Sequence, residues 1–406
     1  MAKSSIVENA MAREHPFPKS YSEQLLIFDR GEGVYLTDID GKRYLDFGSG
    51  IAVNALGYGR KDLADAAAQQ MQKLIHISNL YATQPSLSLG SRLLSLGDFS
   101  AVHFGNSGTE ANEAAIKFAR LYSMEKKGKG NHKLLCFSNA FHGRTLGALS
   151  CTPTEKYQLP YAPLLPDVEV CLFNDVSRLK STLSGNFAGV LVEVLQGEGG
   201  MEVMTSDFAE CLNELCAVHD AVLIADEVQT GLGRCGYPLA SSCVGLKPDI
   251  VTLSKPLAGG LPLSATLIPE KINEMLHIGA HGTTFGGGPV TTAVAGKVLD
   301  SLLNEDFLKR VRTIGEHLGR GLKKICNEIP AVASTKGMGM LRGLEIVEAH
   351  ADQVSPALAS LQEHGLLALK SGARVLRIAP PLVITEEEID TGLSIISKVL
   401  ANQLPA

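Results

Sequence analysis

The sequence predicts an α/β protein with a mainly parallel central sheet sandwiched by helices, and a smaller α+β domain. Short apolar runs recur along the chain about 30 residues apart, with loops and helical patterns between them, which is the spacing of β-α-β units. Within each run the apolar residues are continuous rather than alternating, as in strands that helices cover on both faces. After about Leu303 the pattern changes to long amphipathic helices that enclose short strands, which indicates the second domain.

The large domain is predicted to contain five strands, at 101–104, 134–138, 189–192, 221–225 and 250–254. The first strand is followed by a loop and a helix from about Thr109, because apolar residues recur there at helical spacing. Ser107 and Glu110 stand three residues apart at the start of this helix, as in a capping box. A Gly-rich loop at 283–288 precedes another predicted helix from Val290.

The C-terminal part is predicted to hold helices near 305–328 and 385–402 and strands at 341–346 and 375–378. Thr385 and Glu388 form a second predicted capping box. A hairpin marked by glycines at 33–47 is predicted to pack with this part. The expected organisation is an N-terminal segment that packs with the small domain, a large domain and a small domain, at 1–48, 49–303 and 304–406.

The composition excludes several classes of protein. The 406 residues are 45% hydrophobic and 20% charged, which rules out a disordered or collagen-like chain. The net charge of −6, without a long basic block, argues against nucleic-acid binding. The first twenty residues lack the apolar core of a secretory signal, and no apolar run is long enough for a membrane span. We therefore expect a cytoplasmic protein without membrane contact.

The cysteines and histidines show no metal-binding pattern. The 8 cysteines form neither a CxxC pair nor a Cys/His zinc motif, and the 11 histidines have no HExxH spacing. We expect no metal site, and most of the thiols to be buried in a reducing compartment.

Chemically useful residues follow each of the five predicted strands. Ligands of open α/β sheets bind at the carboxyl ends of the strands, so these residues are expected to meet at one edge. They are a loop and helix start at 105–109, an aromatic ring and an arginine, two carboxylates and a lysine, namely Phe141, Arg144, Glu193, Asp226 and Lys255.

This set matches the requirements of pyridoxal phosphate. The cofactor needs a lysine for its Schiff base and a carboxylate at its pyridine nitrogen. A helix N-terminus suits its phosphate, an aromatic face suits its ring, and an arginine suits the carboxylate of an amino-acid substrate. Taken singly, Asp226 could be a helix N-cap, Phe141 a core residue and Arg144 a surface ion pair. The combination favours the cofactor site.

One motif favours a different class of enzyme. Residues 231–236 fit GxGxxG, the fingerprint of dinucleotide-binding dehydrogenases, and Asp249 follows at a suitable distance. However, residues 226–230 separate the preceding strand from the first glycine, whereas the fingerprint follows its strand directly. We interpret 231–236 as a turn and keep an NAD-dependent dehydrogenase as a distant alternative.

Seven segments resemble, in order, those of the class III aminotransferases, a family of fold-type I pyridoxal-phosphate enzymes that includes the ornithine and acetylornithine types. The similarity extends from about residue 20 to 400. The segments are Asn106–Ala114, Phe141–Thr145, Gln196–Gly200, Asp226–Arg234, Ser254–Lys255, Gly282–Gly287 and Arg377–Leu382. The resemblance accounts for 231–236, because the motif lies inside the segment that carries Asp226.

The resemblance implies one pyridoxal phosphate per subunit, in a Schiff base with Lys255, which also moves a proton in the reaction. It implies that Asp226 pairs with the pyridine nitrogen and that Phe141 stacks on the ring. Val228 and Gln229 are implied to contact the other face of the ring and its 3-oxygen.

The resemblance also implies how the phosphate is held. Ser107, Gly108 and Thr109 are expected to bind it at the helix start. Thr284 is expected to reach the phosphate from a partner subunit, which implies a homodimer with shared active sites.

Substrate contacts follow from the same resemblance. Arg377 resembles the arginine that binds the α-carboxylate of glutamate or 2-oxoglutarate, and Glu198 resembles the glutamate that neutralises it. Arg144 resembles the arginine for a second substrate carboxylate, and Thr283 is a further expected contact. Glu198 and Arg377 could alternatively form a structural ion pair only.

Ile51 stands where ornithine aminotransferases typically have tyrosine, and this favours the acetylornithine branch. The expected reaction moves the δ-amino group of N2-acetylornithine to 2-oxoglutarate, in a ping-pong sequence through pyridoxamine phosphate, as a step of arginine biosynthesis. The sequence departs from the family at Tyr58–Lys61, Pro256 and Gly288, so other amine donors stay open. They are ornithine, succinylornithine, succinyldiaminopimelate, 4-aminobutyrate and putrescine, with glutamate-semialdehyde aminomutase as a further relative and a catalytically silent sensor or scaffold as another class.

Overall fold

The computed structural model describes residues 18, 20 and 26–404 of the 406. The prediction that the first twenty residues form no secretory signal therefore falls almost wholly outside the described residues, as does half of the predicted segment 1–48. No helix in the described part of the chain is long and apolar enough to cross a membrane.

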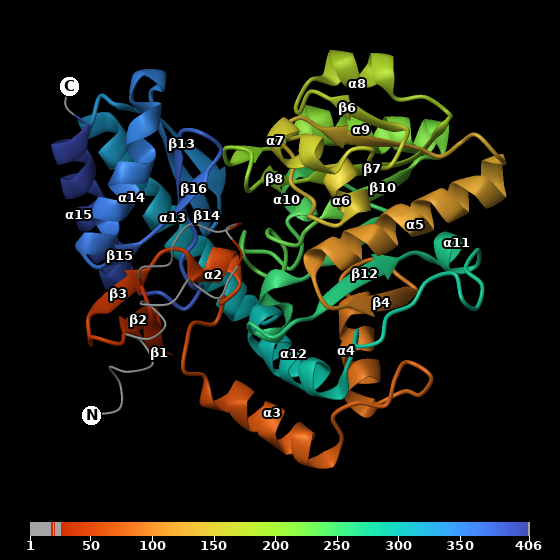
Figure 1. The fold of residues 1–406 in the computed structure, drawn as a ribbon, viewed down its shortest axis with the longest axis horizontal. Coiled ribbons are helices and arrows are strands. Elements are labelled where there is room, and N and C mark those ends of the chain that lie inside the picture. The colour runs from red at the N-terminus through yellow and green to blue at the C-terminus, as the bar shows by residue number, and fades with distance from the viewer. Residues whose placement is uncertain (1–17, 19, 21–25, 405–406) are drawn as a thin grey trace.

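A seven-stranded sheet forms the centre of the larger part of the molecule (Figure 1). All five predicted strands are present, and the predicted mainly parallel α/β fold is confirmed. The order is β4 (Ala101–Gly105), β12 (Ser264–Ile268), β11 (Ile250–Leu253), β10 (Val222–Asp226), β7 (Phe187–Glu193), β5 (Lys133–Phe137) and β6 (Val168–Cys171).

Two strands of this sheet escaped the sequence prediction. β12 runs antiparallel to both of its neighbours, β11 and β4, so the sheet is not parallel throughout. It begins Ser-Ala-Thr directly after a Gly/Pro-rich stretch, which hides the apolar pattern. β6 is a four-residue edge strand whose apolar residues are interrupted by Glu169, so they form no continuous run.

Helices cover both faces of the sheet, as predicted for strands with continuous apolar sequence. One face packs on α5 (Gly108–Lys127), whose buried Ala114, Ala115 and Phe118 share a core cluster with strand residues. The opposite face packs on α4 (Gln84–Leu94), α8 (Val176–Thr182), α9 (Ser206–His219) and α12 (Pro289–Leu302), with α3 (Lys61–Lys73) outside α12.

The remaining elements around this sheet are short. The helices are α2 (Ser49–Ala52), α6 (Leu146–Ser150), α7 (Glu155–Gln158), α10 (Ser241–Val244) and α11 (Glu270–Asn273), and the strands are β8 (Leu195–Gln196) and β9 (Glu202–Val203). Short 3-10 segments lie at Leu159–Tyr161, Lys255–Ala258 and Glu348–Gln353, the last of them kinked at His350.

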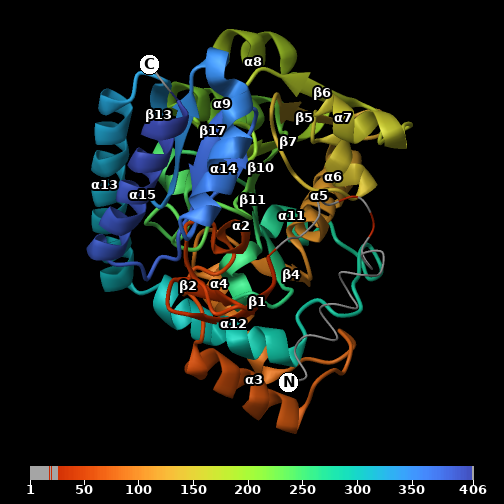
Figure 2. The ribbon, with the colours of Figure 1, turned by 60° about the vertical axis from the view of Figure 1, so that its left-hand side comes forward.

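The C-terminal part is a four-stranded sheet with three long helices, seen together in Figure 2. The strand order is β13 (Val332–Met338), β14 (Leu341–Ile346), β17 (Val375–Ile378) and β16 (Leu369–Ser371), and the helices are α13 (Glu305–Glu328), α14 (Val354–Glu363) and α15 (Glu386–Gln403). The predicted helices and both predicted strands are confirmed here. Thr385 and Glu388 form the predicted capping box.

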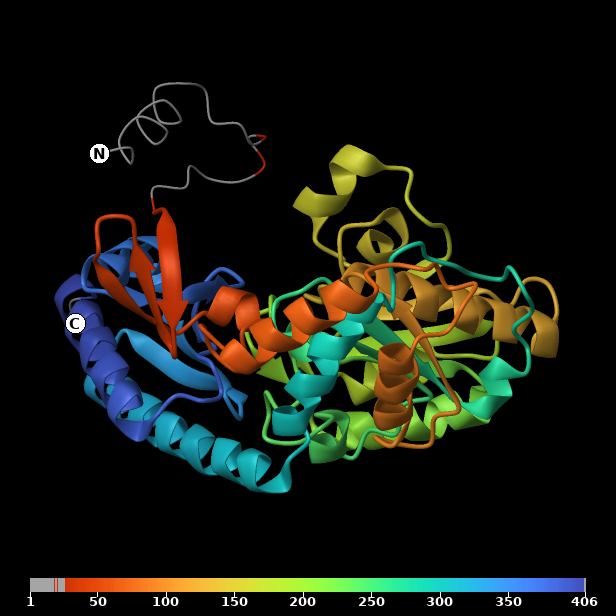
Figure 3. The same cartoon turned by 90° about the horizontal axis from the view of Figure 1, so that it is seen from below.

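The N-terminal strands lie beside this C-terminal part (Figure 3). β1 (Phe28–Glu32), β2 (Tyr35–Asp38) and β3 (Arg43–Asp46) form an antiparallel sheet, and β3 pairs with β15 (Leu366–Leu367). Residues from the two ends of the chain therefore share one sheet. The domain boundaries at 48 and 303 stay a prediction.

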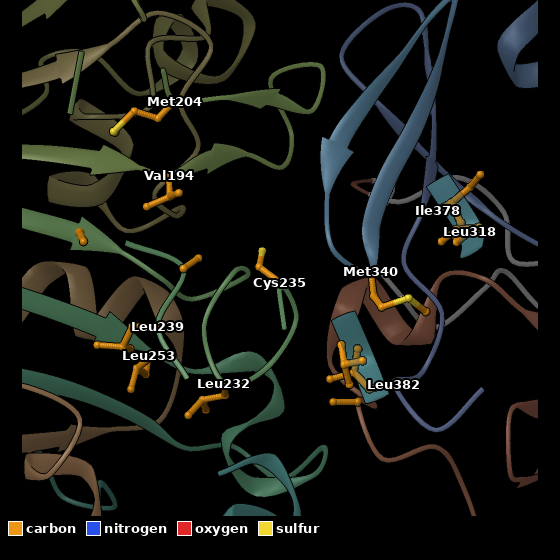
Figure 4. Close-up of a cluster of buried hydrophobic side chains, with 14 of the residues drawn as sticks. Val194, Met204, Leu232, Cys235, Leu239, Leu253, Leu318, Met340, Ile378 and Leu382 are labelled. Carbon is orange, nitrogen blue, oxygen red and sulfur yellow. The ribbon is translucent and has the colours of Figure 1, made fainter. Parts of the chain in front are cut away.

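One hydrophobic core runs through both parts of the molecule. Figure 4 shows Leu253 of β11 and Leu232 of the turn after β10 in the same cluster as Met340 and Leu382. Arg234 is the largest fully buried side chain and crosses between the parts, donating from Nη1 to the carbonyls of Met340 at 3.2 Å and Pro380 at 2.5 Å.

Six of the eight cysteines are buried and all eight are unpaired, in agreement with the expected reduced thiols. The GxGxxG motif at 231–236 forms a turn, because Leu232 N donates to Pro238 O at 2.8 Å and Gly233 N to Tyr237 O at 3.0 Å. It opens no helix, so the geometry that a dinucleotide needs is missing at this motif.

Candidate active site

A cavity of about 500 Å³ lies at the carboxyl ends of the parallel strands, where the sequence predicts it. It is lined by most of the predicted site residues, which come from loops far apart in the sequence. These are Ser107, Gly108, Thr109, Phe141, Arg144, Glu198, Asp226, Val228, Gln229 and Lys255.

Asp226 ends β10 and is nearly fully buried. Its Oδ2 accepts from Asn112 Nδ2 at 2.8 Å and from His142 Nδ1 at 2.7 Å, and its Oδ1 accepts from Val228 N at 3.1 Å. Donors from α5, from the loop after β5 and from its own loop thus hold the carboxylate at the cavity wall.

His142 and Asn112 are functional candidates that sequence reasoning missed. Burial alone would lower the pKa of His142, but the hydrogen bond and the charge of Asp226 outweigh it and raise that pKa. Asn112 also donates to His142 O at 2.7 Å and accepts from Thr252 Oγ1 at 2.8 Å. The available signal was a polar Asn112 next to the apolar face of α5.

Lys255 follows β11 after one residue, Ser254, and begins the 3-10 turn that bends the chain at the cavity. Burial disfavours its ammonium form and lowers its pKa, and the negative charges of Asp226 and Glu198 offset only part of that effect. A lysine with a lowered pKa is more readily present as the neutral amine, which is the nucleophilic and basic form.

The N-terminus of α5 faces the cavity through Ser107, Gly108 and Thr109. Ser107 caps the helix by accepting from Glu110 N at 3.4 Å. The predicted capping box is incomplete, because Glu110 Oε2 accepts from the N and Nδ2 of Asn106, at 2.6 and 2.8 Å, instead of from Ser107 N. The carboxylate therefore fixes the loop that precedes the helix.

A hydrogen bond links Phe141, in the loop after β5, to Glu193, at the end of β7. Glu193 Oε1 accepts from Phe141 N at 3.0 Å, and its Oε2 accepts from Gly197 N at 3.2 Å. Burial raises the pKa of Glu193 to about 7, against the lowering effects of the His142 charge and of these backbone donors. The carboxyl group joins the loop of Phe141 to the loop of Glu198.

Val228 and Gln229 form another wall of the cavity. A methyl group on Gly108 would lie 2.6 Å from Val228 Cγ1, and one on Gly197 would lie 1.6 Å from Gln229 Oε1. Two glycines therefore let loops approach this wall closely. Gln229 Oε1 is buried, and nothing in the described part of the chain donates to it.

Two arginines belong to the site and are held in different ways. Arg377 on β17 is buried, donates to Gly197 O at 2.9 Å and forms an ion pair with Glu198. Arg144 is exposed at the cavity, and its guanidinium carbon lies 3.6 Å from the ring centre of Tyr157.

The Gly-rich loop places Thr283 and Thr284 differently. Thr283 Oγ1 accepts from Asn106 Nδ2 at 3.4 Å, next to the start of α5. Thr284 does not line the main cavity but a separate small hollow with His76, Ser78 and Tyr81. Within one chain, the structure does not bring Thr284 to the other predicted cofactor residues.

These residues fit pyridoxal phosphate. Of the first three N–H groups of α5, that of Glu110 is bonded to Ser107, and no described residue accepts from those of Gly108 and Thr109. Such free donors suit a phosphate. A buried carboxylate, an amine and the unpartnered Gln229 amide oxygen meet in the same cavity.

Fold and site together define an α/β transferase of the type that uses pyridoxal phosphate. Residues 17–400 match the family model described as Aminotransferase class-III, and the chain belongs to this family.

Two relatives and one solved structure are similar over nearly the whole chain. The probable mitochondrial acetylornithine aminotransferase of Dictyostelium discoideum is 41% identical over 92% of this chain and 83% of its own. The acetylornithine aminotransferase of Aquifex aeolicus is 40% identical, covering 94% and 98%. The ornithine aminotransferase of Toxoplasma gondii, which holds PLP at partial occupancy, has a TM-score of 0.92 at 29% identity, covering 99% and 95%.

Proposed function

We propose that this protein is a pyridoxal-phosphate-dependent aminotransferase of arginine biosynthesis. It moves the δ-amino group of N2-acetylornithine to 2-oxoglutarate, giving N-acetylglutamate 5-semialdehyde and glutamate. The observation that carries the proposal is one cavity lined by Lys255, Asp226 and Arg144 together with Glu198, whose carboxylate forms an ion pair with the second arginine, Arg377. The acetylornithine aminotransferases among its relatives support the choice of donor.

Several residues would hold the cofactor. Lys255 would bind it covalently, Asp226 would hold the proton of its ring nitrogen, and Phe141, Val228 and Gln229 would orient the ring. Ser107, Gly108 and Thr109 would bind its phosphate. When bound, pyridoxal phosphate supplies an electron sink for the carbon that carries the amino group.

Lys255 would also move the proton. Its neutral Nζ would accept the proton from the amine-bearing carbon of the donor, and the resulting ammonium would be the acid that gives the proton back. Because burial lowers the pKa of Lys255, the neutral amine that accepts this proton is more readily available than that of an exposed lysine.

The arginines would let one cavity accept two different substrates. N2-acetylornithine presents an ω-amine near Lys255, and Glu198 then neutralises Arg377. 2-Oxoglutarate presents a carboxylate beside its reacting carbon, which would displace Glu198 from Arg377 and bind the guanidinium fork. Arg144 would bind the distal carboxylate of either substrate, with Thr283 as a further contact.

A homodimer is part of the proposal. Thr284 lies apart from the cavity of its own chain and is exposed, so its predicted phosphate contact requires a second copy. Large apolar side chains around that hollow are also exposed, including Leu80 at 83%, Tyr81 at 71% and Phe285 at 67%. Burying them between two copies would remove much apolar surface from water.

The thiols support a proposal for the compartment. All eight cysteines are unpaired, which fits a reducing compartment, and we propose the cytoplasm. The relative from Dictyostelium discoideum is described as mitochondrial, so fractionation of the source cells is the test.

The first experiment is a visible-absorbance titration of the purified protein with N-acetylornithine, ornithine and 4-aminobutyrate. We expect a cofactor band that N-acetylornithine bleaches at the lowest concentration, and no band or turnover in Lys255→Ala. A band bleached best by another amine would replace the donor, and ornithine is the first alternative. No band after adding pyridoxal phosphate, or full activity of Lys255→Ala, would refute the mechanism.

A further inference from the structure

Arg144 reaches the cavity without a carboxylate partner in the described part of the chain, although its guanidinium is exposed. Instead it lies against aromatic rings. Its Cζ is 3.6 Å from the ring centre of Tyr157 and 5.8 Å from that of Phe141. At 3.6 Å, the Tyr157 contact is a close cation–π stack.

The two arginines of the site are therefore restrained by opposite means. Glu198 accepts from Arg377 Nη1, so a substrate carboxylate must displace it to bind the guanidinium. A π face touches the plane of the guanidinium and leaves the N–H groups along its edge free. Arg144 is thus held in place with its carboxylate-binding fork available.

Tyr157 is itself well anchored. It lies on α7, is half-buried, and donates its N–H to Thr154 O at 2.8 Å. The next residue, Gln158, donates from Nε2 to Leu149 O at 2.9 Å and Ser150 O at 3.2 Å, at the end of α6. Because α6 begins two residues after Arg144, α7 folds back over the segment that carries this arginine.

We propose that Tyr157 is a positioning residue that holds Arg144, through its ring and not its hydroxyl, in the orientation that binds the distal carboxylate of a dicarboxylate substrate. The proposal rests on the proposed function for the identity of that substrate. The hydroxyl makes no hydrogen bond to any described residue, so the ring face alone is expected to matter.

The test compares Tyr157→Leu, which removes the ring, with Tyr157→Phe, which keeps it. Binding of glutarate, an unreactive dicarboxylate, is measured by calorimetry on the cofactor-loaded enzyme. We expect about tenfold weaker binding in Tyr157→Leu and less than about twofold change in Tyr157→Phe. The KM for 2-oxoglutarate should rise by a similar factor with little change in kcat, whereas kcat/KM for 2-oxobutyrate, which lacks the distal carboxylate, should not change.

A double-mutant cycle assigns the effect to Arg144. In an Arg144→Gln background, Tyr157→Leu should weaken glutarate binding by less than about twofold more. Tyr157→Met replaces Tyr157→Leu if the latter lowers the melting temperature.

Three results would overturn the proposal: wild-type glutarate affinity in Tyr157→Leu, an equal loss in Tyr157→Phe, or a full additional loss in the Arg144→Gln background. Glutarate binding needs no turnover, so these results remain separate from a failure of the wild-type enzyme to use N-acetylornithine.

Discussion

Asp226 shows how much of the site depends on single contacts. The Asp226 carboxylate is the acceptor in all three of its hydrogen bonds. Two of the three donors belong to residues outside its own loop. A neutral amide in its place would keep the shape of the side chain, but one of its two polar atoms would be a donor that faces another donor.

We expect Asp226→Asn to lower kcat by about 100-fold or more, because the variant loses the fixed negative charge at the proposed ring nitrogen. Steady-state kinetics with saturating pyridoxal phosphate measures this. Asp249→Asn is the matched control, since Asp249 precedes β11 at the opposite edge of the sheet and should keep normal kcat. Equal kcat in wild type and Asp226→Asn would rule out the assigned role.

Glu193 predicts a pH dependence of stability. Burial raises its pKa from the ordinary 4.5 to about 7 in the folded protein. Since the folded-state pKa is raised, its contribution to stability is complete below about pH 4.5 and is lost as the pH rises to about 7, a loss of about 3 kcal/mol. Urea unfolding of Glu193→Gln at pH 5 and pH 8 should show a correspondingly smaller difference than wild type. An unchanged difference would mean that other groups cause the slope.

At the scale of elements, the start of α5 depends on a close approach that only glycine allows. A Cβ at Gly108 would lie 2.6 Å from Val228 Cγ1, so either the helix or the loop after β10 would have to move. We expect Gly108→Ala to weaken pyridoxal-phosphate binding by at least about tenfold and to destabilise the fold by about 1–3 kcal/mol.

The matched control is Gly296→Ala in α12. A methyl group there meets no atom within 4 Å, and the helix interior should gain about 0.5–1 kcal/mol. Cofactor titration and thermal unfolding of both variants distinguish the two sites. Normal cofactor affinity in Gly108→Ala would show that the helix start can shift without cost.

Features that local sequence determines could be predicted, and features that depend on contacts between elements could not. Lys255 and Asp226 were predictable because each ends a continuous apolar run, and Thr385 because its cap is local. Asn112 and Tyr157 could not be found this way, since their roles depend on contacts with other elements. β12 was missed because it buries polar side chains, which a local sequence pattern assigns to the surface. Thr266, for example, is buried because its Oγ1 donates to Ala111 O, a partner far away in the sequence.

Across the whole molecule, Arg234 links the loop after β10 to the C-terminal part. Burial lowers the pKa of Arg234 to about 10. Its guanidinium donates to the carbonyls of Met340 and Pro380. We expect Arg234→Met to lower the free energy of unfolding by about 2 kcal/mol, because these buried carbonyls would lose their charged donor. Urea unfolding at a fixed protein concentration measures it.

The exposed Arg30 provides the control, and Arg30→Met should change the free energy of unfolding by less than about 0.5 kcal/mol. If both variants unfolded like wild type, the two parts of the molecule would be held together by their shared apolar core alone.

The antiparallel strand β12 has a consequence for how the chain reaches this structure. Among the described strands, β4 lies at the edge of the sheet and pairs with β12 alone. The backbone of Phe104 therefore stays unpaired until Ala265 has been synthesised and has folded beside it. Closing such a long loop is slow compared with forming local helices. During synthesis on the ribosome, the loop that would receive the phosphate therefore stays unfixed until more than half of the chain has emerged. Cofactor capture then belongs to the late steps of folding, and a shortage of the vitamin from which the cofactor is made would leave nearly complete chains with an open sheet edge.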